Sequence, residues 1–409
     1  MCPSCIDLFD EKPALEQHVN EQHLVFDAQH SFSVADDTNS EWTVSDLNMT
    51  RKFNEFRDDV IKNSHKYTNL DQFFHQLLAM SSILFIQRRN FYNNIPEHIM
   101  DPQIQQNTRT VLLNELNFRR TLQPGDHEAI KAILTEYRDD IKDMLDVRID
   151  LLTMAKAKPE PERNVLLAIE GLIPTLKDLD LPCLSSENHL TAGYIHPVIQ
   201  HLFAHNPSHI AQCANILPRF ENADKRPDYF VQKFEHYQYA STFCFGEIKV
   251  DTANDISCLN DFYRLALFAK TEMDTSHMNA VICFQTIGLS TTFYIMTRKP
   301  NMLVFVELVT IVLPSNKPSI MSILGYLDDL YSLATLHMSL ESTCQTSFQI
   351  PYLTIRIRPI HYQNVAAKTT CVSWCHCIKV KTINSLPPMP STDFTAQALV
   401  PPTWLARSS

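Results

Sequence analysis

The chain has 409 residues, of which 44% are hydrophobic and 20% are charged, and its formal net charge at pH 7 is −11. This composition is typical of a globular protein with two or three cores, and the acidic balance excludes nucleic-acid binding through overall charge alone. The six glycines form neither a GxGxxG loop nor a Walker A loop, which argues against Rossmann dehydrogenases and P-loop nucleotide hydrolases.

The sequence predicts an intracellular protein of the cytoplasm or nucleus that is not secreted and does not contact a membrane. No basic-then-apolar signal segment opens the chain. The most apolar run, residues 302–313, is too short to span a bilayer and contains Glu307. Eleven cysteines without a signal segment indicate reduced thiols, some of them available to a metal.

Residues 1–24 have the ligand spacing of a zinc finger. Two cysteines separated by two residues are followed after twelve residues by two histidines separated by four. Phe9 and Leu15 stand where the small core of such a finger needs apolar side chains. The segment resembles the two-cysteine, two-histidine (C2H2) finger, a small ββα unit that binds Zn²⁺. Its ligands are Cys2, Cys5, His18 and His23.

The charge of this segment favours a protein partner over DNA. Lys12 is its only basic residue, against five acidic ones, so the finger would release no counterions on binding a phosphate backbone. Only Met1 precedes Cys2, whereas the family usually has an aromatic residue two positions before the first cysteine. Either the first strand is frayed or the start of the chain is truncated.

The remaining chain divides into a helical part and an α/β part. Apolar residues recur at three- and four-residue spacing after Trp42, and β-branched and aromatic runs dominate further on. Leu190, Tyr194 and Leu202 predict a helix that begins near Ser186. The expected segments are a zinc finger at 1–24, a linker at 25–41, a helical region at 42–156, a linker with a short helix at 157–180, an α/β core at 181–345 and an irregular tail at 346–409.

A heptad-like repeat within the helical region predicts one helix after Pro124. This repeat indicates either the ordinary core of a helical bundle or a helix pair, the latter within the chain or between two copies. Its apolar positions are Ile130, Leu134, Tyr137, Ile141, Met144 and Leu151.

Residues 226–250 carry the pattern with the most chemical content. Asp228 follows Arg-Pro and leads a predicted strand, and after eighteen intervening residues a second strand ends in Glu247 and Lys249. Phe243, Phe245, Glu247 and Lys249 alternate with apolar residues, which predicts an inner strand covered on both faces. A buried carboxylate and ammonium need a partner, and a divalent cation held by two carboxylates would supply one.

This stretch resembles the core of the PD-(D/E)XK nucleases over residues 186–287, about a quarter of the chain. It is also similar to a group of fungal proteins with an RPD…GE[IV]K core, which implies no activity. The resemblance implies a mixed sheet flanked by helices, as in restriction endonucleases. It aligns Asp228 with the metal-binding aspartate of the family, Glu247 and Lys249 with its E-x-K pair, and Glu187 with the acidic residue of its first helix.

The chemistry implied is hydrolysis of a phosphodiester in nucleic acid with Mg²⁺ or Mn²⁺. Asp228, Glu247 and the carbonyl of Ile248 would hold the ion, and Lys249 would orient the attacking water. Arg264 and Lys270 on the next helix would contact a flanking phosphate.

Several alternatives stay open at this point. The motif is also compatible with a strand-end salt bridge. The competing function is then a non-catalytic adaptor that binds protein through the finger or the helices, with the core as a scaffold. Gln285 is either a hydrogen-bonding residue at a sheet edge or a functional one. Glu307 is expected at an outward-facing edge position rather than buried.

Overall fold

The computed structural model describes residues 41–67, 69–88, 95–97, 99–178, 186–213, 226–235 and 237–347, with side chains as far as residue 341. All of these residues belong to one compact unit, residues 1–350. The expected zinc finger, with Cys2, Cys5, His18 and His23, and the expected tail after residue 347 lie outside the described residues.

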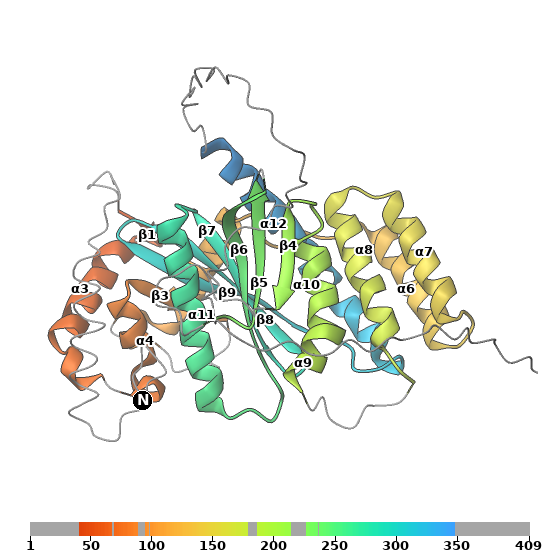
Figure 1. Ribbon diagram of the computed structural model, residues 1–409. Coiled ribbons are helices and arrows are strands. Elements are labelled where there is room, and N and C mark those ends of the chain that lie inside the picture. The colour runs from red at the N-terminus through yellow and green to blue at the C-terminus, as the bar shows by residue number, and fades with distance from the viewer. Residues whose placement is uncertain are drawn as a thin grey trace, which may run out of the picture. The chain divides into compact units, whose positions relative to one another are not determined.

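A seven-stranded mixed sheet forms the centre of the molecule (Figure 1). Its strands pair in the order β3-β9-β8-β7-β6-β5-β4, with β3–β9 and β6–β7 parallel and the other pairs antiparallel. The strands are β3 (Ile83–Ile86), β4 (His209–Cys213), β5 (Tyr229–Glu235), β6 (Gln238–Lys249), β7 (Ala280–Ile287), β8 (Ser290–Lys299) and β9 (Met302–Val312), and a small hairpin is formed by β1 (Thr43–Val44) and β2 (Leu47–Asn48).

Helices cover both faces of the sheet, as its alternating side chains require. α4 and α11 pack on one face, over an aromatic cluster that includes Phe245, Phe262 and Phe305. α8, α10 and α12 contribute to the larger cluster on the other face. The helices are α3 (Met49–Lys62), α4 (Leu70–Met80), α5 (Pro102–Glu115), α6 (Pro124–Arg138), α7 (Met144–Lys156), α8 (Glu160–Leu172), α9 (Glu187–Leu190), α10 (His196–Phe203), α11 (Asp255–Thr275) and α12 (Leu327–Ser347).

Shorter turns connect these helices. They are the 3₁₀ segments η2 (Ser64–Lys66), η3 (Ile173–Thr175) and η5 (Pro318–Tyr326) and a π-helical segment, η4 (Thr191–Ile195), that joins α9 to α10. No helix in the part of the chain that the structure describes is long and apolar enough to cross a membrane.

The expected mixed sheet flanked by helices is confirmed as the general architecture, but several local predictions were wrong. The repeat between residues 130 and 151 does not form one helix, because Asp140 adopts a positive φ of 57° and the chain turns between α6 and α7. Glu307 is not at an outward-facing edge: it lies on the inner strand β9 with 4% of its surface exposed. Its carboxylate accepts a hydrogen bond from the Arg88 amide at 2.7 Å.

The segment expected to be helical, residues 42–156, supplies helices α3 to α7 and also an edge strand of the central sheet. Ile83–Ile86 pair in parallel register with Leu303–Val306 of β9. Helices and sheet therefore share their cores, and residues 181–345 do not contain the whole sheet.

Candidate active site at the end of strand β6

Strand β6 carries Glu247 and Lys249 to one end of the sheet. Side chains of β6 alternate between the faces, with Phe243 and Phe245 on the α11 side and Cys244 and Ile248 on the other. Glu247 continues the α11 side and is completely buried. Lys249 is the last residue of the strand, where its ammonium keeps some contact with solvent.

Gly246 allows the strand to pack tightly at this point. A Cβ atom at this position would overlap the ring of Phe284 on the neighbouring strand β7. The glycine therefore lets an aromatic ring cross directly over the backbone that presents Glu247.

Asp228 reaches the same end from the antiparallel partner strand. It immediately precedes β5, and its carboxylate accepts a hydrogen bond from the amide of Ile248 at 2.9 Å. This bond holds the Asp228 carboxylate at Ile248, between Glu247 and Lys249. The expected proximity of Asp228 to Glu247 and Lys249 is thus present.

Glu187 comes from the first turn of α9, and this helix lies near the lower ends of the strands in Figure 1. Ser186 caps this helix by accepting a hydrogen bond from the His189 amide at 3.1 Å, as expected from the sequence. Pro197 has no amide hydrogen to donate to Gly193, and the Gly193 carbonyl instead accepts a hydrogen bond from Thr175 at 2.8 Å. The π-helical segment η4 lies at this break between α9 and α10.

Lys249 links three carboxylates. Its Nζ lies 3.1 Å from Glu187 Oε1, 3.3 Å from Asp261 Oδ2 and 3.9 Å from Asp228 Oδ2. Burial lowers the pKa of the Lys249 ammonium, but the neighbouring carboxylates outweigh burial and raise the pKa above its ordinary value. Lys249 is therefore a cation at neutral pH.

Asp261 is the member of this cluster that sequence reasoning missed. It lies on α11, is 5% exposed, and accepts a hydrogen bond from Arg264 Nη1 at 2.8 Å. Burial raises the pKa of its carboxyl, whereas Lys249 and Arg264 oppose that shift. Its position three residues before Arg264 was the available signal, because residues at that spacing share a helix face.

Arg264 closes the cluster over Glu247, whereas Lys270 does not reach it. Arg264 Nη2 donates a hydrogen bond to the Arg226 carbonyl at 2.7 Å and lies 3.5 Å from Glu247 Oε1. Lys270 is six residues further along α11 and pairs with Asp274 at 3.2 Å. Of the two expected phosphate contacts, only Arg264 therefore joins the other site residues.

Glu247 is the least satisfied group of the cluster. Neither of its carboxylate oxygens accepts a hydrogen bond from a donor among the described residues, although Arg264 lies within ion-pair distance and a protonated Glu247 would donate to Asp228. Burial raises the pKa of Glu247 well above its ordinary value, and the negative charge of Asp228 raises it further. A buried carboxylate with free lone pairs is what a bound cation would satisfy.

The residues present fit a divalent cation held by few protein ligands. Asp228 lies beside Glu247, because Tyr229 pairs with Gly246 and the Asp228 carboxylate accepts a hydrogen bond from the amide of Ile248. Within the described ranges, no three histidine, cysteine, aspartate or glutamate side chains are arranged to surround one ion. A magnesium-like ion bound here would therefore depend on two carboxylates, a main-chain carbonyl and water.

Gln285 holds the neighbouring strand against α11. It stands opposite Glu247 in the parallel β6–β7 pair, and its side-chain amide donates a hydrogen bond to the Cys258 carbonyl at 2.7 Å. β7 is an inner strand, so the expected sheet-edge position was wrong. The observed hydrogen bond connects the strand to the first turn of the helix that carries Asp261 and Arg264.

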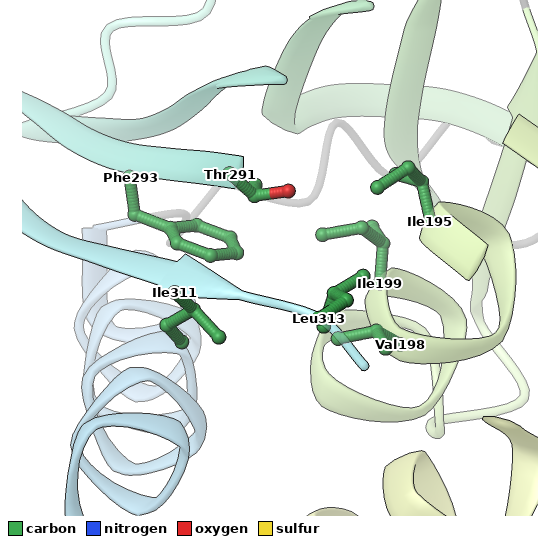
Figure 2. Close-up of a pocket in the computed structure, with 7 residues that line it drawn as sticks. All are labelled: Ile195, Val198, Ile199, Thr291, Phe293, Ile311 and Leu313. Carbon is green, nitrogen blue, oxygen red and sulfur yellow. The ribbon is translucent and has the colours of Figure 1, made fainter. Parts of the chain in front are cut away.

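A small apolar cavity lies apart from this cluster, between α10 and the ends of β8 and β9 (Figure 2). It measures about 10 Å³, room for about one water molecule. Six of its seven lining side chains are apolar, and the hydroxyl of the seventh, Thr291, is hydrogen-bonded to Thr286 at 3.0 Å. The cavity therefore lacks polar groups that would orient a ligand.

Comparisons with known proteins add no assignment: no family model, no curated protein and no solved structure matches this chain.

Proposed function

We propose that the cluster is the active site of a PD-(D/E)XK-type core that hydrolyses phosphodiester bonds in nucleic acid with Mg²⁺ or Mn²⁺. The observation that carries the proposal is the meeting of Glu187, Asp228, Glu247 and Lys249, which come from a helix and two strands. The β5–β6 hairpin by itself brings Asp228 beside Glu247, so the independent observation is that Glu187, 62 residues before Lys249, joins them.

The order of the surrounding elements supports the same proposal. A helical segment, α9 to α10, precedes the antiparallel strands β4, β5 and β6. α11 then leads to β7, which pairs in parallel with β6. Helix, strands, helix and strand is the order that the resemblance implies for a restriction-endonuclease-like core.

Each residue has a defined task under this proposal. A divalent cation bound by Asp228 and Glu247 would acidify a water molecule and neutralise charge at the scissile phosphate. Lys249 would hold that water and donate hydrogen bonds as negative charge develops. Glu187 and Asp261 contact the Lys249 ammonium from two elements, and Arg264 would contact a flanking phosphate.

A second candidate function is a non-catalytic adaptor in which this cluster only stabilises the core. It is favoured by the pairing of both cations: Lys249 and Arg264 each contact carboxylates of the chain itself. A phosphate would therefore have to compete with internal ion pairs. The net charge of −11 opposes nucleic-acid binding in the same way.

Calorimetry with Mn²⁺ and Mg²⁺ on the full chain distinguishes the two functions. Asp228→Asn and Glu247→Gln are compared with the wild type, and Asp274→Asn, on α11 but outside the cluster, is the matched control. Cation binding at other sites is the same in all of these proteins, so it does not affect the comparison. We expect both cluster variants, and not the control, to lose one binding event.

A nuclease assay completes the test. Labelled single- and double-stranded DNA and RNA are incubated with each protein in Mg²⁺ or Mn²⁺. Cleavage that is lost in both cluster variants supports the proposed enzyme. Identical cation binding in the wild type and in both folded cluster variants would contradict it and favour the adaptor.

A further inference from the structure

Arg264 contacts two buried carboxylates but donates a hydrogen bond to one of them. Its Nη1 donates to Asp261 Oδ1 at 2.8 Å, whereas its Nη2 lies 3.5 Å from Glu247 Oε1. Glu247 is completely buried and Asp261 is 5% exposed. Among the described residues, neither oxygen of Glu247 accepts a hydrogen bond and the Nε of Arg264 donates none. A strong charge-assisted pairing with the buried Glu247 carboxylate is therefore left unmade.

Two hydrogen bonds hold the Arg264 guanidinium away from Glu247. Besides the bond from Nη1 to Asp261, Nη2 donates to the main-chain carbonyl of Arg226 at 2.7 Å. Asp261 stands three residues before Arg264 on α11, so the two side chains share one face of the helix. The guanidinium group is planar, so bonds to both of its terminal nitrogens also fix its orientation.

Without Asp261, a small movement would bring the guanidinium onto Glu247. The distance between Arg264 Nη2 and Glu247 Oε1 exceeds an ordinary charge-assisted hydrogen bond by about 0.7 Å. A carboxylate that pairs with arginine in this way offers fewer lone pairs to a metal ion, and the guanidinium charge repels the ion. An Arg264–Glu247 ion pair and a divalent cation on Glu247 therefore compete for the same oxygens.

We propose that Asp261 is a positioning residue, which holds Arg264 and thereby keeps the Glu247 carboxylate available to a divalent cation. The inference rests on the proposed cation site and adds to it a residue that is not one of the proposed ligands. Asp261 also lies 3.3 Å from Lys249 Nζ, so one carboxylate contacts both cations of the cluster.

Calorimetry with Mn²⁺ on the full chain tests this role with two substitutions of the same carboxylate. Asp261→Asn and Asp261→Ala remove the same charge, but only asparagine keeps an oxygen that accepts a hydrogen bond from Arg264. The binding event to be compared is the one that Asp228→Asn removes. We expect Asp261→Ala to weaken this event about tenfold or more, and Asp261→Asn to weaken it clearly less. A general effect of the lost charge would weaken both variants equally.

Asp274→Ala is the matched control for Asp261→Ala. Asp274 also lies on α11 and also contacts a lysine and an arginine, Lys270 and Arg298, each at 3.2 Å. These contacts lie outside the cluster around Glu247. Its substitution should leave the Mn²⁺ affinity unchanged.

Removing Arg264 as well should restore what Asp261→Ala loses. Arg264→Met should tighten Mn²⁺ binding about tenfold in the Asp261→Ala background, and should change it by less than about threefold in the wild-type background. The two changes would be equal if Arg264 acted only through its charge. Circular dichroism melting of each variant monitors folding. Asp261→Leu, which fills the space without an acceptor, replaces Asp261→Ala if that variant does not melt cooperatively.

The possible results separate this inference from the proposed function. A wild type that binds Mn²⁺ at the cluster no more tightly than Asp261→Ala would overturn the role of Asp261 and leave the cation site standing. Equal weakening by Asp261→Asn and Asp261→Ala would do the same. A wild type without any binding event that depends on Asp228 would instead contradict the proposed function.

Crystal structures of the cation-free wild type and Asp261→Ala then decide the inference by themselves. In the variant, Arg264 Nη2 should move from 3.5 Å to within about 3 Å of Glu247 Oε1. A guanidinium that keeps its wild-type position would show that Asp261 does not hold it away from Glu247, and would overturn the inference.

Discussion

At the scale of single residues, Lys249 is the group on which the charge balance of the candidate site depends. It lies within 4 Å of three carboxylates, of which Asp261 is buried and the other two are partly exposed. We expect Lys249→Met to lower the free energy of unfolding by about 1–3 kcal/mol, since the substitution removes this cation from the buried Asp261 carboxylate and its two partly exposed neighbours. Urea denaturation measures the change.

The matched control is Lys270→Met on α11. Among the described residues, Lys270 forms an ion pair with the partly exposed Asp274 alone, so we expect a loss of about 0.5 kcal/mol or less. Mg²⁺ should restore part of the stability of Lys249→Met and none of that of Lys270→Met. Equal losses in the free energy of unfolding would show that the ion pairs of Lys249 stabilise the fold no more than an ordinary surface ion pair does.

Two buried histidines make the stability of the protein depend on pH. Burial lowers the pKa of His337 to about 3, and burial together with the cation of Lys233 lowers that of His209 to about 4. Both side chains are neutral in the fold, and their unfolded pKa is near 6.5. The unfolded state therefore binds more protons below pH 6.5, and the stability present above that pH is lost progressively as the pH falls towards 4.

We expect each of these histidines to lower the free energy of unfolding by up to about 1.4 kcal/mol per pH unit in this window. His337→Phe should flatten the dependence, because a phenyl ring can occupy the same aromatic surroundings of Phe203, His209 and Phe243 without titrating. Urea midpoints at pH 7 and pH 4.5 measure the difference. A wild-type stability that does not change between these pH values would contradict the assignment.

The sequence indicated most of the candidate site because its groups sit at recognisable local positions. Asp228 precedes a strand, Glu247 and Lys249 end one, and Glu187 follows a helix cap. Asp261 gave only the weak signal of its spacing to Arg264, since an acid inside an amphipathic helix is ordinary until its neighbours in space are known. The ion pairs of Lys249 and Arg264 with carboxylates likewise depend on the tertiary structure, and no sequence pattern indicates them.

At the scale of elements, Gly246 decides how closely β6 approaches β7. We expect Gly246→Ala to destabilise the protein by about 1–3 kcal/mol, because the added Cβ would overlap the ring of Phe284. Adding Phe284→Leu should recover part of this loss. Gly125→Ala is the control, since a Cβ there meets nothing within 4 Å and alanine favours the helix. A thermal melt in which both alanine variants behave alike would contradict the packing argument.

The elements that could be predicted from sequence are those whose pattern is long and uniform. β7, β8 and β9 are rich in β-branched and aromatic residues, and α11 keeps a helical repeat over 21 residues. β3 has four apolar residues directly after the helix α4, so its sequence continues the helical pattern. The turn between α6 and α7 contains neither glycine nor proline, and the apolar repeat passes through it unchanged.

At the scale of the whole molecule, the sheet is assembled from distant parts of the chain. β3 pairs with β9 across more than 200 residues, and α4 packs with α11 on the same face. Leu303 and Phe305 of β9 are completely buried, in the cluster that Phe74 and Phe85 complete. The candidate site is therefore carried by a core that begins well before residue 181.

This arrangement predicts different behaviour for two fragments. We expect residues 41–347 to unfold cooperatively, because they include both faces of the sheet. Residues 181–347 should be insoluble or bind a hydrophobic dye, since removing β3 and α4 exposes the edge of β9 and the aromatic cluster. Soluble yield, dye fluorescence and circular dichroism melting compare the two. A cooperative melt of residues 181–347 at the same temperature as residues 41–347 would show that the core is independent of the N-terminal helices.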